Sequence, residues 1–244
     1  MAISVPLRHE LKFFINPMEY EVLSRVLRHT LWKDPNGDEN NEYHIRSLYF
    51  DTRFNDALID KLDGVKNRDK YRIRIYNFSD KVIRMECKTK VGQLISKRSI
   101  GIPKLLAEQL IAGDPTGLER TRSGLLRDVY REMAINGLKP VVIVDYVREA
   151  YIHPAEEVRI TFDKQLHTGL RSNDLFNPYV PTVPAFDHNE MILEVKFNRF
   201  LPPYIRDILC THVHSAQNSA ISKYVWCRRF ENFEYSCKKI SGNN

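Results

Sequence analysis

The stretch KYRIRIYN, residues 70–77, decides how the fold is interpreted. Successive side chains of a β-strand point to opposite faces, so Arg72 and Arg74 share one face while Ile73 and Ile75 share the other. Taken alone, this stretch fits an ordinary half-buried strand with its isoleucines in the core and its arginines in water. The alternative is a sheet whose charged face turns inward. The two interpretations predict opposite positions for the arginines.

The same alternation of charged and apolar residues recurs in RHELKFFI (8–15), MECKTK (85–90), EVRITFD (157–163) and LEVKF (193–197). Two guanidinium groups two residues apart on a strand lie roughly 7 Å apart, and at an effective dielectric near 20 they repel by about 2 kcal/mol. Charged faces turned toward each other would need interleaved carboxylates and a bound polyanion to relieve this repulsion. Helices would have to cover the apolar outer face.

Composition describes an ordinary folded protein with a basic balance. The chain has 244 residues, 43% of them hydrophobic and 28% charged, and 37 Lys and Arg stand against 31 Asp and Glu. A net charge of +6 favours an anionic partner. No apolar run approaches the roughly 18 residues of a membrane span and no leader opens the chain, so we expect a cytoplasmic protein. The four cysteines have no zinc spacing and are expected as free thiols.

Periodicity and turn residues predict about eight strands, mostly in sequential antiparallel order, mixed with helices. The strands are expected near 7–15, 43–51, 69–77, 81–90, 96–98, 139–150, 156–166 and 190–198. The helices are expected from the Asn16 cap to about Trp32, through 54–62, at 103–112 and 121–136, and after Pro202. The first helix is expected to bury Met18, Val22, Val26 and Leu27. No linker or repeat divides the chain, so a single domain is expected over residues 1–244.

Eight segments in order carry a family resemblance: RHELKFFI, RSLYFDT, KYRIRIYN, MECKTK, VREAY, VRITFD, ILEVKF and SKYVWCRR. Together they resemble the polyphosphate polymerase domain of the vacuolar transporter chaperone (VTC) family, which belongs to the triphosphate tunnel metalloenzymes related to the CYTH proteins. The resemblance covers roughly residues 7–230 and leaves 231–244 as a tail. It implies an α+β fold, namely an antiparallel closed β-tunnel of about eight strands with a charged lumen, covered outside by helices. The arginines would then face inward.

The resemblance also implies a site. The triphosphate-binding residues would be Lys12, Lys61, Arg72, Arg74, Lys88, Lys97, Arg148, Arg159, Lys196, Ser222 and Lys223. Arg72, Arg74, Lys88, Glu194 and Lys223 would be catalytic. Glu194 matches the metal ligand, with Glu10 and Glu86 as further candidates for Mn²⁺ or Mg²⁺. The first strand carries one carboxylate, Glu10, where the CYTH ExExK motif has two.

Each of these residues also has a structural explanation when taken singly. Lys12, Lys88 and Lys97 fit solvated strand lysines, and Arg148 and Arg159 fit bridges between carboxylates of neighbouring strands. Only their common alignment on separate strands favours a shared lumen.

Nothing in the chain matches a P-loop, a kinase glycine loop, HExxH or GxSxG. Phosphoryl transfer would therefore rely on side-chain bases, which suits a reaction that needs positioning and charge neutralisation. A polyphosphate chain that attacks the γ-phosphate of ATP gives a polymerase, which is the expected function, and attack by water gives a triphosphatase.

Two non-enzymatic alternatives remain, a polyphosphate-binding module and an RNA-binding protein. RNA binding is the weakest because the aromatic residues form no identifiable exposed stacking array, and no nucleic-acid partner is expected. ATP and polyphosphate or triphosphate are the expected partners. The chain shows no membrane segment of its own, so a membrane partner would be separately encoded.

Overall fold

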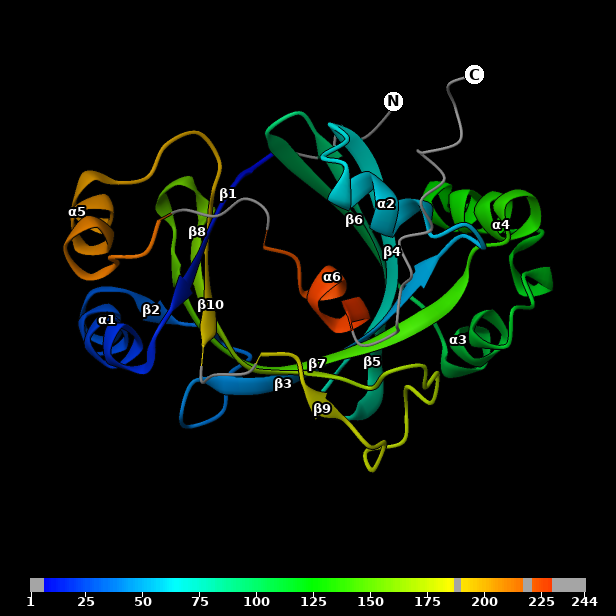
Figure 1. The fold of residues 1–244 in the computed structure, drawn as a ribbon, viewed down its shortest axis with the longest axis horizontal. Helices are drawn as coiled ribbons and strands as arrows, with labels where there is room; N and C mark the ends of the chain where they lie inside the picture. Colours follow the sequence, from blue (N-terminus) through cyan, green and yellow to red (C-terminus); the bar gives the residue numbers. More distant parts are fainter. Residues whose placement is uncertain (1–6, 187–189, 217–220, 230–244) are drawn as a thin grey trace, which may run out of the picture.

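The fold is one antiparallel sheet that curls around a central space (Figure 1). The computed structural model describes residues 7–186, 190–216 and 221–229. The sheet order is β1-β10-β8-β7-β3-β4-β5-β6. Its long strands are β1 (His9–Ile15), β3 (Glu42–Asp51), β4 (Asn67–Tyr76), β5 (Ser79–Val91), β6 (Leu94–Gly101), β7 (Lys139–His153), β8 (Val158–Thr168) and β10 (Met191–Phe197). The short strands β2 (Trp32–Lys33) and β9 (Val183–Pro184) pair with β7 and β8. The tail at 231–244 lies outside the described residues.

The two edge strands of the curled sheet meet at one point. Arg8, just before β1, forms a β-bridge with Ile95 of β6. The Arg8 amide donates to the Ile95 carbonyl at 2.9 Å, and the Ile95 amide donates back at 3.1 Å. Within the described residues this bridge takes the place of a full ladder between β1 and β6. The expected tunnel fold is therefore confirmed, with a ring that is joined by a single bridge.

Helices cover the outside of both side walls (Figure 1). Helices α1 (Pro17–Thr30) and α5 (Pro203–His212) lie beside the β1, β10 and β8 wall, and α3 (Lys104–Ile111) and α4 (Gly124–Asn136) lie beside the β4, β5 and β6 wall. Two helices occupy other places: α2 (Asp56–Leu62) follows β3, and α6 (Lys223–Arg228) lies inside the curl over β7. Single 3-10 turns occur at Thr116–Leu118 and Ala155–Glu157. No helix among the described residues is long and apolar enough to cross a membrane.

Helix α1 begins as expected but turns a different side toward the sheet. Asn16 and Glu19 form the predicted capping box, with the Glu19 amide 2.9 Å from the Asn16 side chain. The predicted stripe is wrong at Met18, which is 76% exposed, and at Val22, which is 43% exposed, and it is confirmed at Leu27, which is buried. Leu23, one turn before Leu27, is buried with it, and both pack against the outer face of β8 and β10.

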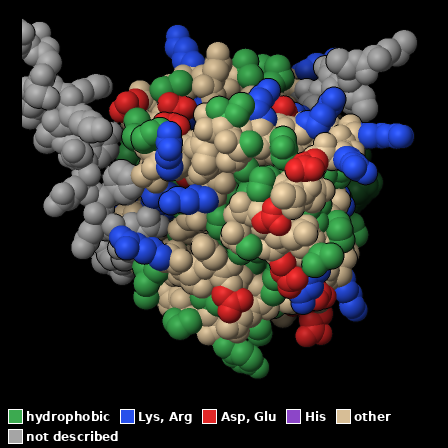
Figure 2. Space-filling model, turned by 90° about the vertical axis from the view of Figure 1, so that its right-hand side faces the viewer, with side chains coloured by type: hydrophobic (Ala, Val, Ile, Leu, Met, Phe, Trp, Pro, Cys, Tyr) green, Lys and Arg blue, Asp and Glu red, His purple; other side chains and the backbone are tan. Residues whose placement is uncertain are grey.

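The two faces of the strand at residues 70–77 have distinct surroundings. Ile73 and Ile75 are fully buried on the outer face of β4, where they pack in one cluster with Ala107 of α3 and Val129 of α4. The arginines of the same strand therefore face the lumen. Figure 2 shows the outer surface on the side of α3 and α4, where acidic and basic side chains are interspersed. Inside the curl, basic side chains outnumber the acidic ones among the residues that line the lumen.

Candidate active site

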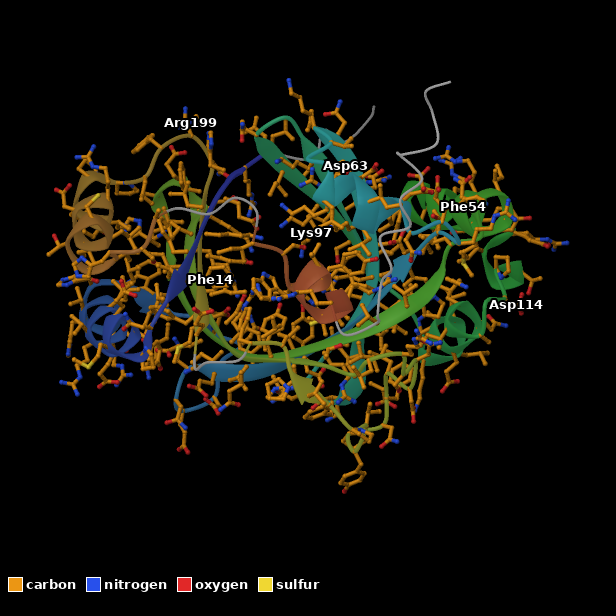
Figure 3. The ribbon with its side chains drawn as sticks, in the orientation of Figure 1. Phe14, Phe54, Asp63, Lys97, Asp114 and Arg199 are labelled. Carbon is orange, nitrogen blue, oxygen red and sulfur yellow. The ribbon has the colours of Figure 1, made fainter. Side chains whose placement is uncertain are left out.

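The curled sheet encloses a cavity of about 1060 Å³. Its wall contains every residue that the sequence placed in the triphosphate site, together with two of the three candidate metal ligands: Lys12, Lys61, Arg72, Arg74, Lys88, Lys97, Arg148, Arg159, Lys196, Ser222, Lys223, Glu10 and Glu194. Figure 3 shows Lys97 inside the curl, whereas Asp114 and Arg199 lie at the periphery. The structure thus brings together residues from seven strands, from α2 and from the start of α6.

Glu194 lies at the centre of a group of four cations. Its carboxylate is 2.8 Å from Lys223 Nζ and 3.0 Å from Lys196 Nζ, and it lies 3.6 Å from Lys12 Nζ and 3.7 Å from the Arg148 guanidinium. Burial alone would raise the pKa of Glu194, but Lys196 and Lys223 outweigh burial and hold the pKa well below its usual value. Glu194 is therefore a buried carboxylate that keeps its charge.

Glu10 is the second carboxylate of the cavity wall. It lies 2.8 Å from Lys88 Nζ, 3.5 Å from Lys12 Nζ and 3.6 Å from Lys196 Nζ. Burial would raise the pKa of Glu10, yet Lys12 and Lys88 lower it. Burial lowers the pKa of Lys88 to about 7, against the opposing effect of Glu10. Glu10 and Glu194 share Lys12 and Lys196 as partners, so the two carboxylates and these two lysines form one cluster.

Glu86 sits behind the cavity wall and holds the β4 arginines. It is 1% exposed and does not line the cavity, while Arg72 contacts it at 2.6 Å and Lys97 at 2.9 Å. Arg74 is farther from Glu86, at 3.8 Å, and donates to the Ser47 hydroxyl at 3.0 Å. Among the three candidate metal ligands, Glu86 has the least access to the cavity.

Asp163 is a site residue that sequence reasoning missed. Its carboxylate receives two hydrogen bonds from Arg148, at 2.6 and 2.8 Å, and lies 2.5 Å from Lys223 Nζ. Asp163 fixes the orientation of the Arg148 guanidinium, because a paired hydrogen bond of this kind has a defined geometry. Asp163 shares its strand face with Arg159, so extending the alternation of EVRITFD by one step would have found it.

Two further arginines bear on the register. The Arg159 guanidinium pairs with Asp34, in the loop after β2, and donates to the Tyr43 hydroxyl at 2.7 Å. Arg98, next to Lys97 on β6, contacts Asp128 of α4 at 2.5 Å on the outside of the sheet. The inward register expected for Lys97 therefore agrees with the outward position of its neighbour.

Six more cations line the cavity and were not predicted: Arg8, Arg68, Lys70, Lys81, Arg84 and Lys90. Arg68 and Lys70 have the same parity as Arg72 on β4, and Lys90 continues the face of Lys88 on β5. Lys70 is two residues before Arg72, so the inward position expected for Arg72 would also have identified Lys70. The Lys70 ammonium donates to the Ser222 hydroxyl at 3.3 Å.

The residues present fit a divalent metal only together with a phosphate ligand. No group of three or more His, Cys, Asp or Glu side chains is arranged to hold a metal in the part of the chain that the structure describes. Mg²⁺ is commonly bound by one or two carboxylates plus substrate phosphates and water, which matches Glu194 and Glu10 at the cavity wall. Cys87 and Cys210 are free thiols, as expected, and Cys237 lies outside the described residues.

Comparisons with known proteins agree with this fold. A protein from Hippeastrum studied as an adenylyl cyclase, with a dominant triphosphatase activity, has a TM-score of 0.58 at 16% identity, over 92% of this chain and 95% of that chain. A Bacillus halodurans protein described as an adenylate cyclase has a TM-score of 0.53 at 16% identity, over 93% and 99%. No curated protein sequence matches. The VTC domain family model matches residues 7–230, and the chain therefore belongs to the VTC domain family.

Proposed function

We propose that this protein is a metal-dependent polyphosphate polymerase that transfers the γ-phosphate of ATP onto a growing polyphosphate chain. One observation carries the proposal. This chain belongs to the VTC domain family, and cations from separate strands of its cavity wall surround two charged carboxylates, Glu10 and Glu194. Such a wall is complementary to a polyanion of closely spaced phosphates. An isolated surface array of lysines would not need the buried carboxylates.

The cavity residues have complementary roles in this reaction. Arg72 and Arg74 would hold non-bridging phosphate oxygens through their planar guanidinium groups, which Glu86, Ser47 and Tyr146 already orient. A terminal oxygen of the polyphosphate chain attacks the γ-phosphorus of ATP. A new P–O–P linkage forms as the bond from the γ-phosphorus to the bridging oxygen breaks, and ADP leaves. The positive wall stabilises the charge on the oxygens during this transfer.

Glu194, with Glu10 beside it, would hold a divalent metal at the bound phosphates. Mn²⁺ or Mg²⁺ at this place would supply positive charge at the transferring phosphoryl group. Lys88 and Lys196 already contact these carboxylates, so both lysines would be positioned by the same groups that bind the metal.

Hydrolysis of triphosphate or ATP is the second candidate function. The Hippeastrum protein that shares this fold has a dominant triphosphatase activity, and the same cavity would serve attack by water. The acceptor, a phosphate chain or water, is what separates the two functions.

The test is incubation of the purified protein with ATP and Mn²⁺, and in parallel with Mg²⁺, followed by separation of long-chain polyphosphate from free phosphate. We expect metal-dependent formation of polyphosphate and ADP. Release of free phosphate without chains would establish the triphosphatase instead. Phosphate binding without turnover under either metal would leave a polyphosphate-binding module and refute both enzymatic proposals.

A further inference from the structure

The lumen face of β4 carries four cations in a row, Arg68, Lys70, Arg72 and Arg74, and all four line the cavity. Their partners across the sheet on β5 differ in charge. Arg72 lies opposite Glu86, whereas Lys70 lies opposite Lys88 and Arg68 lies opposite Lys90. Arg74, at the other end, lies opposite Arg84 but also has Glu86 at 3.8 Å. Like charges directly opposite each other on neighbouring strands destabilise a sheet. Electrostatic repulsion therefore destabilises the β4–β5 pair at its Arg68 end. This repulsion is absent where Arg72 lies opposite Glu86.

Carboxylates relieve this repulsion in one part of the lumen and not in the other. Lys88 contacts Glu10 and Lys97 contacts Glu86. Within residues 7–186, 190–216 and 221–229, Lys70 forms no salt bridge, and its partners are the Ser222 hydroxyl at 3.3 Å and the face of the Tyr224 ring at 4.8 Å. Arg68 and Lys90 likewise form no salt bridge in that part of the chain. Among the described residues, Lys70, Arg68 and Lys90 thus have no carboxylate within salt-bridge distance, and Asp60 acts on Arg68 only at longer range.

Electrostatics around Lys70 support this difference. Burial lowers the pKa of Lys70 well below its usual value, and Arg68, Lys61 and Lys12 lower it further. Lys12 shows the opposite result: burial would lower its pKa, but Glu10 and Glu194 outweigh burial and raise it. A buried cation among cations is costly unless an anion accompanies it.

We propose that Lys70, with Arg68 and Lys90, forms a separate anion subsite for phosphoryl groups of a linear phosphate chain beyond the three nearest the catalytic carboxylates. The inference rests on the proposed function and adds a direction to it: the chain leaves the reacting centre along the Arg68 end of β4. Ser222 contributes a hydroxyl at the boundary, since it touches Lys70 and immediately precedes Lys223. The subsite gives the protein a preference for chains longer than triphosphate.

The experiment compares two ligands, inorganic tripolyphosphate and a much longer linear polyphosphate, by titration calorimetry at fixed salt without nucleotide. Fixed salt is essential because affinity for phosphates depends on ionic strength. The variant is Lys70→Met, which keeps the length of the side chain and removes its charge. The matched control is Lys104→Gln, which removes one positive charge at an outer ion pair with Asp80.

We expect Lys70→Met to weaken binding of the long chain by about tenfold, the effect of losing one charged hydrogen bond, and to change tripolyphosphate affinity by less than about twofold. Lys104→Gln should change neither. The unliganded Lys70→Met variant should melt at the same temperature as the wild type or higher, because it removes repulsion at the Arg68 end of the lumen.

Equal losses for the two ligands would overturn the subsite and make Lys70 part of the triphosphate site. No loss for either ligand, or a wild type with equal affinity for both, would also overturn it. If the wild type binds neither phosphate, the proposed function itself fails, which distinguishes that result from failure of the subsite alone.

Discussion

The two faces of β4 are both buried, but different forces hold them. Ile73 and Ile75 are fully buried on the outer face against α3 and α4, where packing and the hydrophobic effect act. Arg74 on the inner face is 5% exposed, yet its neighbours are Ser47, Tyr146 and Glu86. Burial therefore does not identify the core of this sheet. The outer face stabilises the fold, and the inner face orients charges for a ligand.

The largest effect is expected from a charge placed on the outer face. Ile73→Asp would leave an unpaired carboxylate among apolar side chains with no room for water, and it should destabilise the protein by about 4 kcal/mol or more. We expect loss of the folded state in urea denaturation. Phe54→Asp, at an exposed position, is the control and should leave the transition unchanged. A folded Ile73→Asp protein would contradict the assignment of the outer face as the core.

Glu194→Gln should keep the fold and much of the triphosphate affinity while lowering metal-dependent turnover by about 100-fold or more, the size expected when a major charge contact of the transition state is lost. The measurement is the rate with ATP at saturating Mn²⁺. Glu157→Gln is the control, because Glu157 pairs with Arg8 at the surface and lies outside the Glu194 cluster. Turnover at the parent rate would transfer the metal role to Glu10.

Triphosphate bound in the cavity should raise the free energy of unfolding of the protein. A ligand at about 100 times its dissociation constant adds roughly 2.7 kcal/mol, which in a protein of this size corresponds to a rise in melting temperature of about 5–10 °C. Thermal unfolding with and without millimolar tripolyphosphate measures it. An unchanged melting temperature would indicate that the cavity does not bind triphosphate.

Arg74→Ala should reduce activity by about tenfold or more, and Arg98→Ala should leave it nearly unchanged. Both changes remove one arginine from a strand, but Arg98 contacts Asp128 on the outside of the sheet. Steady-state rates of the two purified variants test the register directly. Equal losses would mean that the inward and outward faces are not functionally distinct.

The smallest effect concerns pH. Burial lowers the pKa of both Lys61 and Lys97 to about 8, below the value near 10.4 of an unfolded lysine. Between these pKa values the unfolded chain binds more protons than the folded one, so stability should rise as pH increases from about 8 to 10. Melting temperatures of the unliganded protein across this window should therefore climb more steeply than those of a Lys61→Gln/Lys97→Gln variant. If the melting temperatures of the two proteins changed with pH in parallel, the lowered pKa values of Lys61 and Lys97 would be contradicted.

Strand alternation predicted much of this site. It could not predict side-chain partners that come from segments distant in the sequence. Once the family resemblance implied that Arg72 and Arg74 face the lumen, the alternation of β4 would also have placed Lys70 there, and the alternation of β8 from Arg159 would have placed Asp163. The contact between Arg159 and Asp34 joins a strand to a loop and has no local signature.

The inner helix shows the same limit. The sequence identified SKYVWCRR (222–229) only through the family resemblance. The position of α6 over β7 depends on Tyr224 and Cys227, which pack in one cluster with Val144. For α1, hydrophobicity predicted Met18 and Leu27 as buried, whereas the residues that pack against the sheet are Leu23 and Leu27.

The pairing of β1 with β10 has a consequence for how the chain is made. His9 pairs with Phe197, so the first strand finds its ladder partner only after the chain has been synthesised as far as β10. At roughly 5–20 residues per second, β1 waits on the order of ten seconds or more after it has been translated. Pairing across such a sequence separation has a high loop-closure cost and is slow. Joining of the ring is thus expected as the last folding step, and slower translation would prolong the time during which the strand edges of β1 and β6 are exposed.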